Sequence, residues 1–144
     1  MDPVLLSSKS NDWETPPAFF EALNLEFQFN LDPCCTPETA KTPTYFTKEQ
    51  DGLKQSWEGY RVFCNPPYGR EIGKWVKKAY EESLKGALVV LLVPARTDTS
   101  YWHDYITKGE IRFIRGRLHF SNSKAPAPFP SVIVIFRGDL IWKQ

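Results

Sequence analysis

Long hydrophobic runs are absent from the sequence. Its longest apolar stretch covers residues 87–93, whereas a membrane-spanning helix needs about 20 consecutive apolar residues. The first residues also lack the basic start and the apolar segment of a secretory signal peptide. We therefore expect a cytoplasmic protein that does not bind a membrane.

Cysteine and histidine are scarce. The three cysteines include the adjacent pair Cys34 and Cys35, and their odd number argues against a disulfide framework and for a reducing compartment. His103 and His119 have no cysteine or histidine partner at the spacing of a metal site. The sequence therefore predicts no metal centre. We interpret Cys34 and Cys35 as small packing residues rather than as nucleophiles.

The length and composition predict one folded domain. The chain has 144 residues, of which 42% are hydrophobic and 24% are charged, a composition that excludes a disordered chain. This length buries one real hydrophobic core. We expect residues 1–12 to form a loose tail and residues 13–144 to form a single domain.

Charge is distributed unevenly along the chain. Residues 1–60 carry 4 Lys and Arg against 10 Asp and Glu, a net charge of −6, while residues 61–144 carry 14 against 7, a net charge of +7. The first part therefore suits a cationic ligand and the second a polyanion. The alternative is that folding interleaves the two parts and removes the asymmetry.

Hydrophobic patterns predict strands that alternate with helices. Residues 33–59 are predicted to be a loop with one short element near Tyr45 and Phe46. The order of elements predicts an open α/β sheet with right-handed crossovers. The expected strands cover residues 27–31, 61–64, 87–93, 111–115 and 132–136; the expected helices start at Thr15, cover residues 72–84 and cover residues 100–108.

Unusual residues follow three of the expected strands. In open α/β sheets, ligands bind beyond the carboxyl ends of the strands. Asp32 follows the first strand and Arg96 follows the buried strand. Asp32 could instead end its strand, and Arg96 could grip a phosphate, orient a target or pair with a structural carboxylate. The third of these strand ends carries Asn65, Pro66, Pro67 and Tyr68.

Residues 65–68 have the chemistry to bind a planar group that carries an NH₂. The two prolines form a rigid segment without N–H donors, and Asn65 adds a side-chain acceptor. The amine protons would go to Asn65 Oδ1 and the Pro66 carbonyl, while the Tyr68 ring stacks on the planar group. Two acceptors also stabilise the positive charge that develops when such an amine attacks an electrophile. The alternative is a proline-rich turn with a core tyrosine.

An Asn-Pro-Pro-Tyr motif after a strand resembles the catalytic motif of the amino-methyltransferases that use S-adenosyl-L-methionine (AdoMet). The wider pattern resembles the phage-type DNA N6-adenine methyltransferases. The resemblance implies a compact, abbreviated Rossmann-like methyltransferase domain whose open sheet is mostly parallel with an antiparallel last strand. The matching stretches are residues 12–16, 31–35, 51–53 with Trp57, 63–69, 92–97 and 115–118 with Phe120.

The resemblance also implies a role for each matching residue. Residues 65–68 would form the catalytic motif that holds the target base. Asp51 would contact the adenine of AdoMet, although Asp-Gly is also an ordinary turn. The usual glycine-rich turn is replaced by residues 34–37. Two further groups are implied at the cofactor: Trp13, Thr15 and Pro16 near its methionine end, and Asp32, Pro33 and Cys34 at the first strand.

Basic residues supply candidate contacts to DNA. A solvated face is the simpler explanation for Lys74 and Lys78 on the expected helix. Arg112 and His119 join the candidates because, with Arg115 and Arg117, they lead into the long loop over residues 116–130. The candidate DNA-binding residues are Arg70, Arg96, Arg115 and Arg117.

Together these features predict methyl transfer from AdoMet to N6 of an adenine flipped out of double-stranded DNA, in a bacterial or phage-infected cell. Only residues 116–130 and the tail are left to read bases, so we expect a short recognition sequence or relaxed specificity. The alternatives are methylation of RNA or of a protein glutamine, and a non-catalytic nucleic-acid-binding domain of the same fold.

Overall fold

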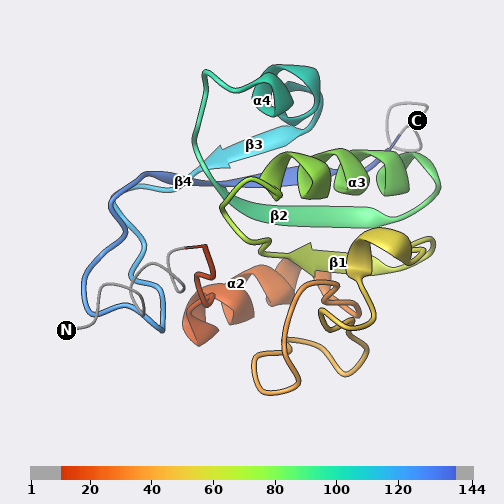
Figure 1. Ribbon diagram of the computed structural model, residues 1–144, viewed down its shortest axis with the longest axis horizontal. Helices are drawn as coiled ribbons and strands as arrows, with labels where there is room; N and C mark the ends of the chain where they lie inside the picture. Colours follow the sequence, from red (N-terminus) through yellow and green to blue (C-terminus); the bar gives the residue numbers. More distant parts are fainter. Residues whose placement is uncertain (1–10, 139–144) are drawn as a thin grey trace.

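A computed structural model of the chain describes residues 11–138, and most of the expected tail therefore lies outside the described residues. The fold is a small α/β domain with a four-stranded sheet in the order β1-β2-β4-β3 (Figure 1). None of the helices within residues 11–138 is long and apolar enough to cross a membrane. The elements are α2 (Pro17–Phe27), η1 (Gly52–Lys54), β1 (Arg61–Cys64), α3 (Ile72–Leu84), β2 (Leu88–Pro94), α4 (Ser100–Asp104), η2 (Ile106–Lys108), β3 (Glu110–Phe113) and β4 (Ser131–Phe136).

The sheet is mixed. β1 pairs with β2 in parallel, whereas β4 lies between β2 and β3 and is antiparallel to both. β1, β2 and β3 therefore run in one direction, and the expected antiparallel last strand is confirmed. Only one of these three pairings is parallel. The expectation of a mostly parallel sheet is therefore wrong for the strand pairs, although three of the four strands run in one direction. The cause is the insertion of β4 between two strands that share a direction.

Helices cover both faces of the sheet. Phe63 and Phe136 pair in register with consecutive residues of β2, and the side chains of consecutive residues point to opposite faces. Phe20 of α2 packs on Phe63 with ring centroids 5.2 Å apart, and Tyr80 of α3 packs on Phe136 at 5.7 Å. α2 and α3 therefore lie on opposite faces, and β4 is buried along its whole length.

The clearest sequence patterns predicted their elements closely. The strand over residues 61–64 and the helix over residues 72–84 have the expected bounds. β2 differs by one residue at each end, and β4 differs by one residue at its start. An isolated parallel bridge between Asp32 and Tyr45 confirms the short element expected near Tyr45. Continuous apolar strands and an amphipathic helix leave few alternatives.

The strand expected over residues 27–31 is wrong. α2 continues through Phe27 and ends at Gln28, whose φ is 53°. Asn24 holds this end, because its carbonyl accepts from Gln28 N at 2.8 Å and its Oδ1 accepts from Phe29 N at 2.7 Å. Leu31 makes only an isolated parallel bridge to Val62.

Other element boundaries also differ from the sequence expectations. The first helix starts at Pro17, and the residue before it is Pro16 rather than a capping Thr15. The helix expected over residues 100–108 is split into α4 and the 3-10 helix η2, with Tyr105 between them at φ −128°. β3 ends at Phe113 instead of residue 115.

Gly52 marks a close approach between two loops. A Cβ at this position would overlap the carbonyl oxygen of Pro33 and would lie 3.1 Å from Cη2 of Trp75. Gly52 is buried, and its own carbonyl accepts a hydrogen bond from Trp57 Nε1 at 2.9 Å. The segment over residues 51–57 is therefore packed directly against the segment that follows Asp32.

We predict that Gly52→Ala destabilises the fold by about 1–3 kcal/mol, because backbone atoms rather than a flexible side chain occupy the space for the new methyl group. Gly73→Ala in α3 is the matched control. Its Cβ would lie 3.5 Å from Tyr101 Cδ2, an ordinary contact, and alanine favours a helix by about 0.5 kcal/mol. Urea unfolding measures both; equal stability of Gly52→Ala and the wild type would contradict the close approach.

Candidate functional site

Asn65 begins the motif directly after β1, at the carboxyl end of that strand. Its Nδ2 donates one hydrogen bond to Thr15 Oγ1 at 2.9 Å and another to the Trp13 carbonyl. Its Oδ1 is buried and has no hydrogen-bond partner among the described residues. An amide with both donors engaged keeps one orientation, so the structure fixes Oδ1 as an open acceptor.

Residues 11–15 lie between the motif and the loop that joins β3 to β4. On one side, Tyr68 N donates to the Asn11 carbonyl at 2.7 Å. On the other side, Asn122 Nδ2 donates to the Asp12 carbonyl at 2.7 Å, and its Oδ1 accepts from Glu14 N at 2.9 Å. Sequence reasoning missed Asn122, because its partners are backbone atoms more than 100 residues away and leave no local pattern.

Tyr68 is a buried residue with 2% of its surface exposed. Its hydroxyl donates to the Leu92 carbonyl at 3.0 Å, and its ring packs edge-on against Phe120 and Phe129 at 6.2 and 5.7 Å. Burial raises the pKa of Tyr68 well above its usual value. The structure therefore places Tyr68 in the core, which matches the alternative given above for this tyrosine rather than an exposed stacking platform.

Arg96 holds the end of the motif from the loop that follows β2. Its Nη1 donates to the Tyr68 carbonyl at 2.9 Å. This partner is a backbone carbonyl, neither a phosphate nor a structural carboxylate. Arg96 therefore joins the carboxyl ends of β1 and β2.

Asp32 is buried, with 4% of its surface exposed. Its Oδ1 accepts from Cys34 N at 3.3 Å and its Oδ2 from Lys41 N at 3.1 Å. Burial raises the pKa of Asp32 to about 6, and these two backbone hydrogen bonds act in the opposite direction. The bridge between Leu31 and Val62 places this carboxylate beside β1, so Asp32 and Asn65 follow neighbouring segments.

The three thiols do not have the environment of a nucleophile. Burial raises the pKa of Cys35 to about 12 and moves the pKa of Cys34 and Cys64 further upward. A thiol with a raised pKa stays protonated and unreactive near neutral pH. Within residues 11–138 no cluster of three or more His, Cys, Asp or Glu side chains is arranged to hold a metal ion.

Asp51 lies in the turn that packs against Pro33. Its backbone is left-handed, with φ 56°, and its Oδ1 accepts from Leu53 N at 3.1 Å as the cap of η1. The turn expected for Asp-Gly is therefore present. The contact between Gly52 and Pro33 also brings this carboxylate to the segment of Asp32.

The candidate DNA-binding arginines differ in their surroundings. Arg70, Arg115 and Arg117 are exposed, and Arg117 Nη1 donates a long hydrogen bond of 3.5 Å to the Ala127 carbonyl. Arg115 follows β3, which runs in the same direction as β1 and β2. Arg70 follows β1, and Arg115 and Arg117 follow β3. All three therefore lie in segments that leave the sheet at the edge that carries the motif.

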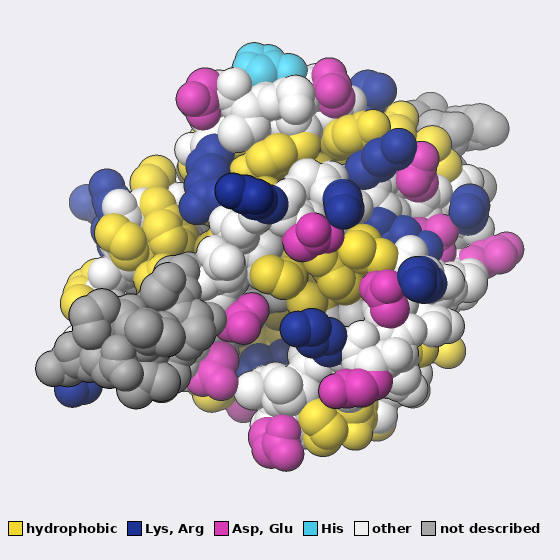
Figure 2. Space-filling view, viewed as in Figure 1, with side chains coloured by type: hydrophobic (Ala, Val, Ile, Leu, Met, Phe, Trp, Pro, Cys, Tyr) yellow, Lys and Arg dark blue, Asp and Glu magenta, His cyan; other side chains and the backbone are white. Residues whose placement is uncertain are grey.

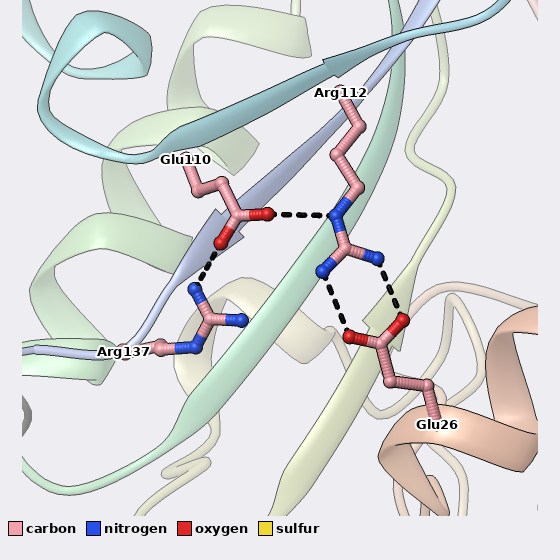
Figure 3. Close-up of polar contacts among 4 residues, drawn as sticks. All are labelled: Glu26, Glu110, Arg112 and Arg137. Carbon is pink, nitrogen blue, oxygen red and sulfur yellow. Dashed lines mark hydrogen bonds and ion pairs between the residues drawn. The ribbon is translucent and has the colours of Figure 1, made fainter.

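Arg112 is engaged by two carboxylates (Figure 3). Its Nη1 and Nη2 bind Glu26 at 2.6 and 2.7 Å, and its Nε binds Glu110 at 2.7 Å. Arg137 binds the other oxygen of Glu110. The expectation that Arg112 contacts phosphate is therefore wrong, because this network ties β3 to α2 and uses the guanidinium.

The surface shows whether the acidic and basic parts of the sequence stay separate in the fold. On the face in Figure 2, Lys and Arg side chains are interspersed with Asp and Glu side chains and do not form one basic patch. Folding therefore interleaves the acidic and basic parts of the chain on this face.

We predict that the contribution of Asp32 to stability falls as the pH rises from about 4 to about 6. Glu26, Glu82 and Glu110 act in the opposite direction, because their pKa values are lowered in the fold. The pKa of Asp32 is higher in the folded protein than in the unfolded chain. In this window the folded protein keeps a proton that the unfolded chain has released, so each step upward in pH favours unfolding, by up to about 3 kcal/mol in total. Asp32→Asn should remove this fall.

The measurement is urea unfolding of the wild type, Asp32→Asn and the exposed control Glu38→Gln across this pH range. Glu38→Gln should keep the pH dependence of the wild type. The same pH dependence in Asp32→Asn as in the wild type would show that Asp32 makes no such contribution.

Comparisons with known proteins identify the family of the chain. A DNA N-6-adenine-methyltransferase of Haemophilus phage HP1 (strain HP1c1) is 28% identical over 139 residues, which cover 86% of this chain and 77% of that protein. The DNA N-6-adenine-methyltransferase of Escherichia phage T1 is 28% identical over 92 residues, which cover 62% of this chain and 38% of that protein.

A crystal structure from Thermoplasma acidophilum superposes with a TM-score of 0.46 and 12% identity over 85% of this chain and 88% of that chain. The family model described as DNA N-6-adenine-methyltransferase (Dam) matches residues 4–138. Because this match spans nearly the whole sequence, the chain belongs to the DNA N-6-adenine-methyltransferase (Dam) family.

Proposed function

We propose that this chain transfers a methyl group from AdoMet to N6 of an adenine flipped out of double-stranded DNA. The observation that carries the proposal is the buried Oδ1 of Asn65, which has no hydrogen-bond partner within residues 11–138 while both amide protons are bound to residues 13 and 15. Membership of the family supplies the reaction class and the target base. The unpartnered Oδ1 supports the assignment of Asn65 as an acceptor for the amine of the target base.

Asn65 acts on the target amine through hydrogen bonding. The lone pair of an exocyclic amine is delocalised into its ring, so the amine is a weak nucleophile. Oδ1 of Asn65 and the Pro66 carbonyl would accept its two protons, draw the nitrogen towards tetrahedral geometry and stabilise the developing positive charge. A stacked duplex hides this approach to N6, so the adenine has to leave the helix first.

The residues near Asp32 fit a cationic cofactor. A buried carboxylate with a raised pKa gains stability when a positive charge lies beside it, and AdoMet carries a sulfonium and an ammonium group. When bound, AdoMet would supply the methyl group, with its carbon–sulfur bond broken in exchange for the new bond to N6 and the proton of N6 lost to water. The residues that would hold it are Trp13, Thr15, Pro16, Asp32, Pro33, Cys34 and Asp51.

Tyr68 serves the site in a different way from a stacking platform. Phe120 and Phe129 cover its ring, so a base reaches the ring only if the loop between β3 and β4 moves. In the arrangement seen here, Tyr68 anchors the motif to β2 through Leu92. Pro67 separates this anchor from the two acceptors of Asn65 and Pro66.

Exposed basic residues would hold the phosphate backbone. Arg70, Arg115 and Arg117 are free of the carboxylates that engage Arg112, and phosphate contacts of this kind provide affinity without reading sequence. Arg96 holds the Tyr68 carbonyl of the motif, so we do not assign it to the phosphate backbone of DNA. We assign all of these functions to one domain, residues 13–144.

We expect Asn65→Ala to lose at least 100-fold in turnover, because the variant lacks the acceptor that stabilises the transition state. Transfer of labelled methyl from AdoMet to unmethylated DNA, with nucleoside analysis of the product, measures this. AdoMet affinity is measured in parallel and turnover is compared at saturating AdoMet, because the variant also loses the hydrogen bonds from Nδ2 to residues 13 and 15. The matched control is Asn30→Ala, which removes the hydrogen bond of 2.7 Å that Arg61 N donates to Asn30 Oδ1 at the opposite end of β1.

N6-methyladenine formed by the wild type and by Asn30→Ala, but not by Asn65→Ala, supports the proposal. Full activity of Asn65→Ala would overturn the role of its oxygen. Labelling of RNA or of protein glutamine instead of DNA would overturn the assignment of DNA as the substrate.

We predict that Tyr68→Phe lowers stability by about 1 kcal/mol, because it removes the hydrogen bond to the buried Leu92 carbonyl. Tyr68→Ala should cost about 3–5 kcal/mol, because it also removes the ring from the aromatic cluster. Urea unfolding measures both losses. If Tyr68→Ala is as stable as the wild type but raises the KM for DNA, the ring binds the base directly and the anchoring role is wrong.

A further inference from the structure

Glu82 is a buried carboxylate on α3 that the proposed reaction does not use. Only 2% of its surface is exposed. Its Oε1 accepts from Trp57 N at 2.5 Å, and its Oε2 lies 3.6 Å from Lys78 Nζ and 3.3 Å from Lys85 Nζ. Burial by itself would raise the pKa of Glu82, but the Trp57 N–H and the two lysines lower it below its usual value. The carboxylate is therefore kept ionised inside the fold.

Trp57 connects Glu82 to the Asp51–Gly52 turn. Its side chain is fully buried, and its Nε1 donates to the Gly52 carbonyl at 2.9 Å. The indole also stacks on Trp75 of α3, with ring centroids 6.3 Å apart and an angle of 26° between the planes. One tryptophan thus donates a hydrogen bond to α3 from its backbone N–H and another to the turn from its ring N–H.

The turn itself is packed against the backbone of Pro33. Gly52 leaves no space there for a Cβ, and Asp51 is held in a left-handed conformation by its own cap to Leu53. A shift of Trp57 would move the Gly52 carbonyl and thereby the Asp51 carboxylate. Residues 33–59 contain only the short η1 as a named element, so this loop depends on such side-chain contacts for its position.

We propose that Glu82 is a positioning residue for the AdoMet site: through Trp57 it holds the Asp51–Gly52 turn against Pro33 and so sets the position of Asp51. The inference rests on the proposed function, in which Asp51 and Asp32 face the cofactor. Glu82 itself does not touch the cofactor.

The test is the affinity of the full chain for AdoMet, measured by titration calorimetry. Glu82→Ala should weaken binding about tenfold, the effect of losing one charge-assisted hydrogen bond. Glu82→Gln keeps an oxygen that accepts from Trp57 N and should bind within about threefold of the wild type. Lys85→Ala removes one ion pair but leaves the hydrogen bond, and it should bind as the wild type does.

A double-variant cycle separates positioning from a general structural role. If Glu82 acts through Asp51, Glu82→Ala combined with Asp51→Ala should bind no more weakly than Asp51→Ala alone. Losses that multiply would overturn the proposal. DNA affinity should stay within twofold in Glu82→Ala, since the motif and its arginines are held by other contacts.

The remaining outcomes are distinct. If the wild type binds AdoMet and Glu82→Ala binds equally well, the positioning role is wrong and the proposed function stands. If the wild type binds no AdoMet, the proposed function fails and this inference fails with it. Should Glu82→Ala not fold, Glu82→Asp replaces it: its carboxylate is one methylene shorter, and the same tenfold loss is expected.

Discussion

The two hydrogen bonds donated by Asn65 Nδ2 are the interaction on which the rest of the candidate site depends. A carboxamide has two N–H donors and one acceptor oxygen. With both donors held by residues 13 and 15, Oδ1 is the only group of this side chain left for another molecule. Residues 12–16 contain no helix or strand, so their position has to come from tertiary contacts.

Those contacts come from two sides. Tyr68 N binds the backbone of Asn11, and Asn122 binds the backbone at residues 12 and 14. The ring of Trp13 packs on Phe120 and Phe129, which also cover Tyr68. The site is thus assembled from three segments that are far apart in the sequence, and aromatic packing joins them. The open oxygen of Asn65 exists only when all three segments are in place.

This assembly explains which parts of the protein were predictable from the sequence. β1, α3, β2 and β4 follow from local hydrophobic patterns, because burial on one or both faces fixes their period. The strand expected before Asp32 was wrong because Asn24 ends α2 with hydrogen bonds that the apolar alternation of Phe27, Phe29 and Leu31 does not reveal. Local patterns also fail for Arg112, since Glu26 lies 86 residues away.

The candidate site shows the same limit. Asn65 and Thr15 were singled out by motif, and the structure brings their side chains together. Asn122 and Glu82 were not, because each acts on backbone N–H or C=O groups of distant residues. A backbone partner leaves no residue type to search for in the sequence. Burial of Tyr68 was equally hidden, since the phenylalanines that cover it lie in a loop without periodic pattern.

The two sides of the site therefore depend on different parts of the fold. A glycine-rich turn would allow close backbone approach within one segment, but residues 34–37 contain no glycine. Here the close approach occurs between two loops, at Gly52 and Pro33, and α3 maintains it through Trp57. The side around Asn65 is held instead by the loop between β3 and β4. The two sides meet at β1, where Leu31 bridges to Val62 and Asn65 follows the last residue of the strand. Because β1 is parallel to the buried β2, its register fixes how the two sides face each other.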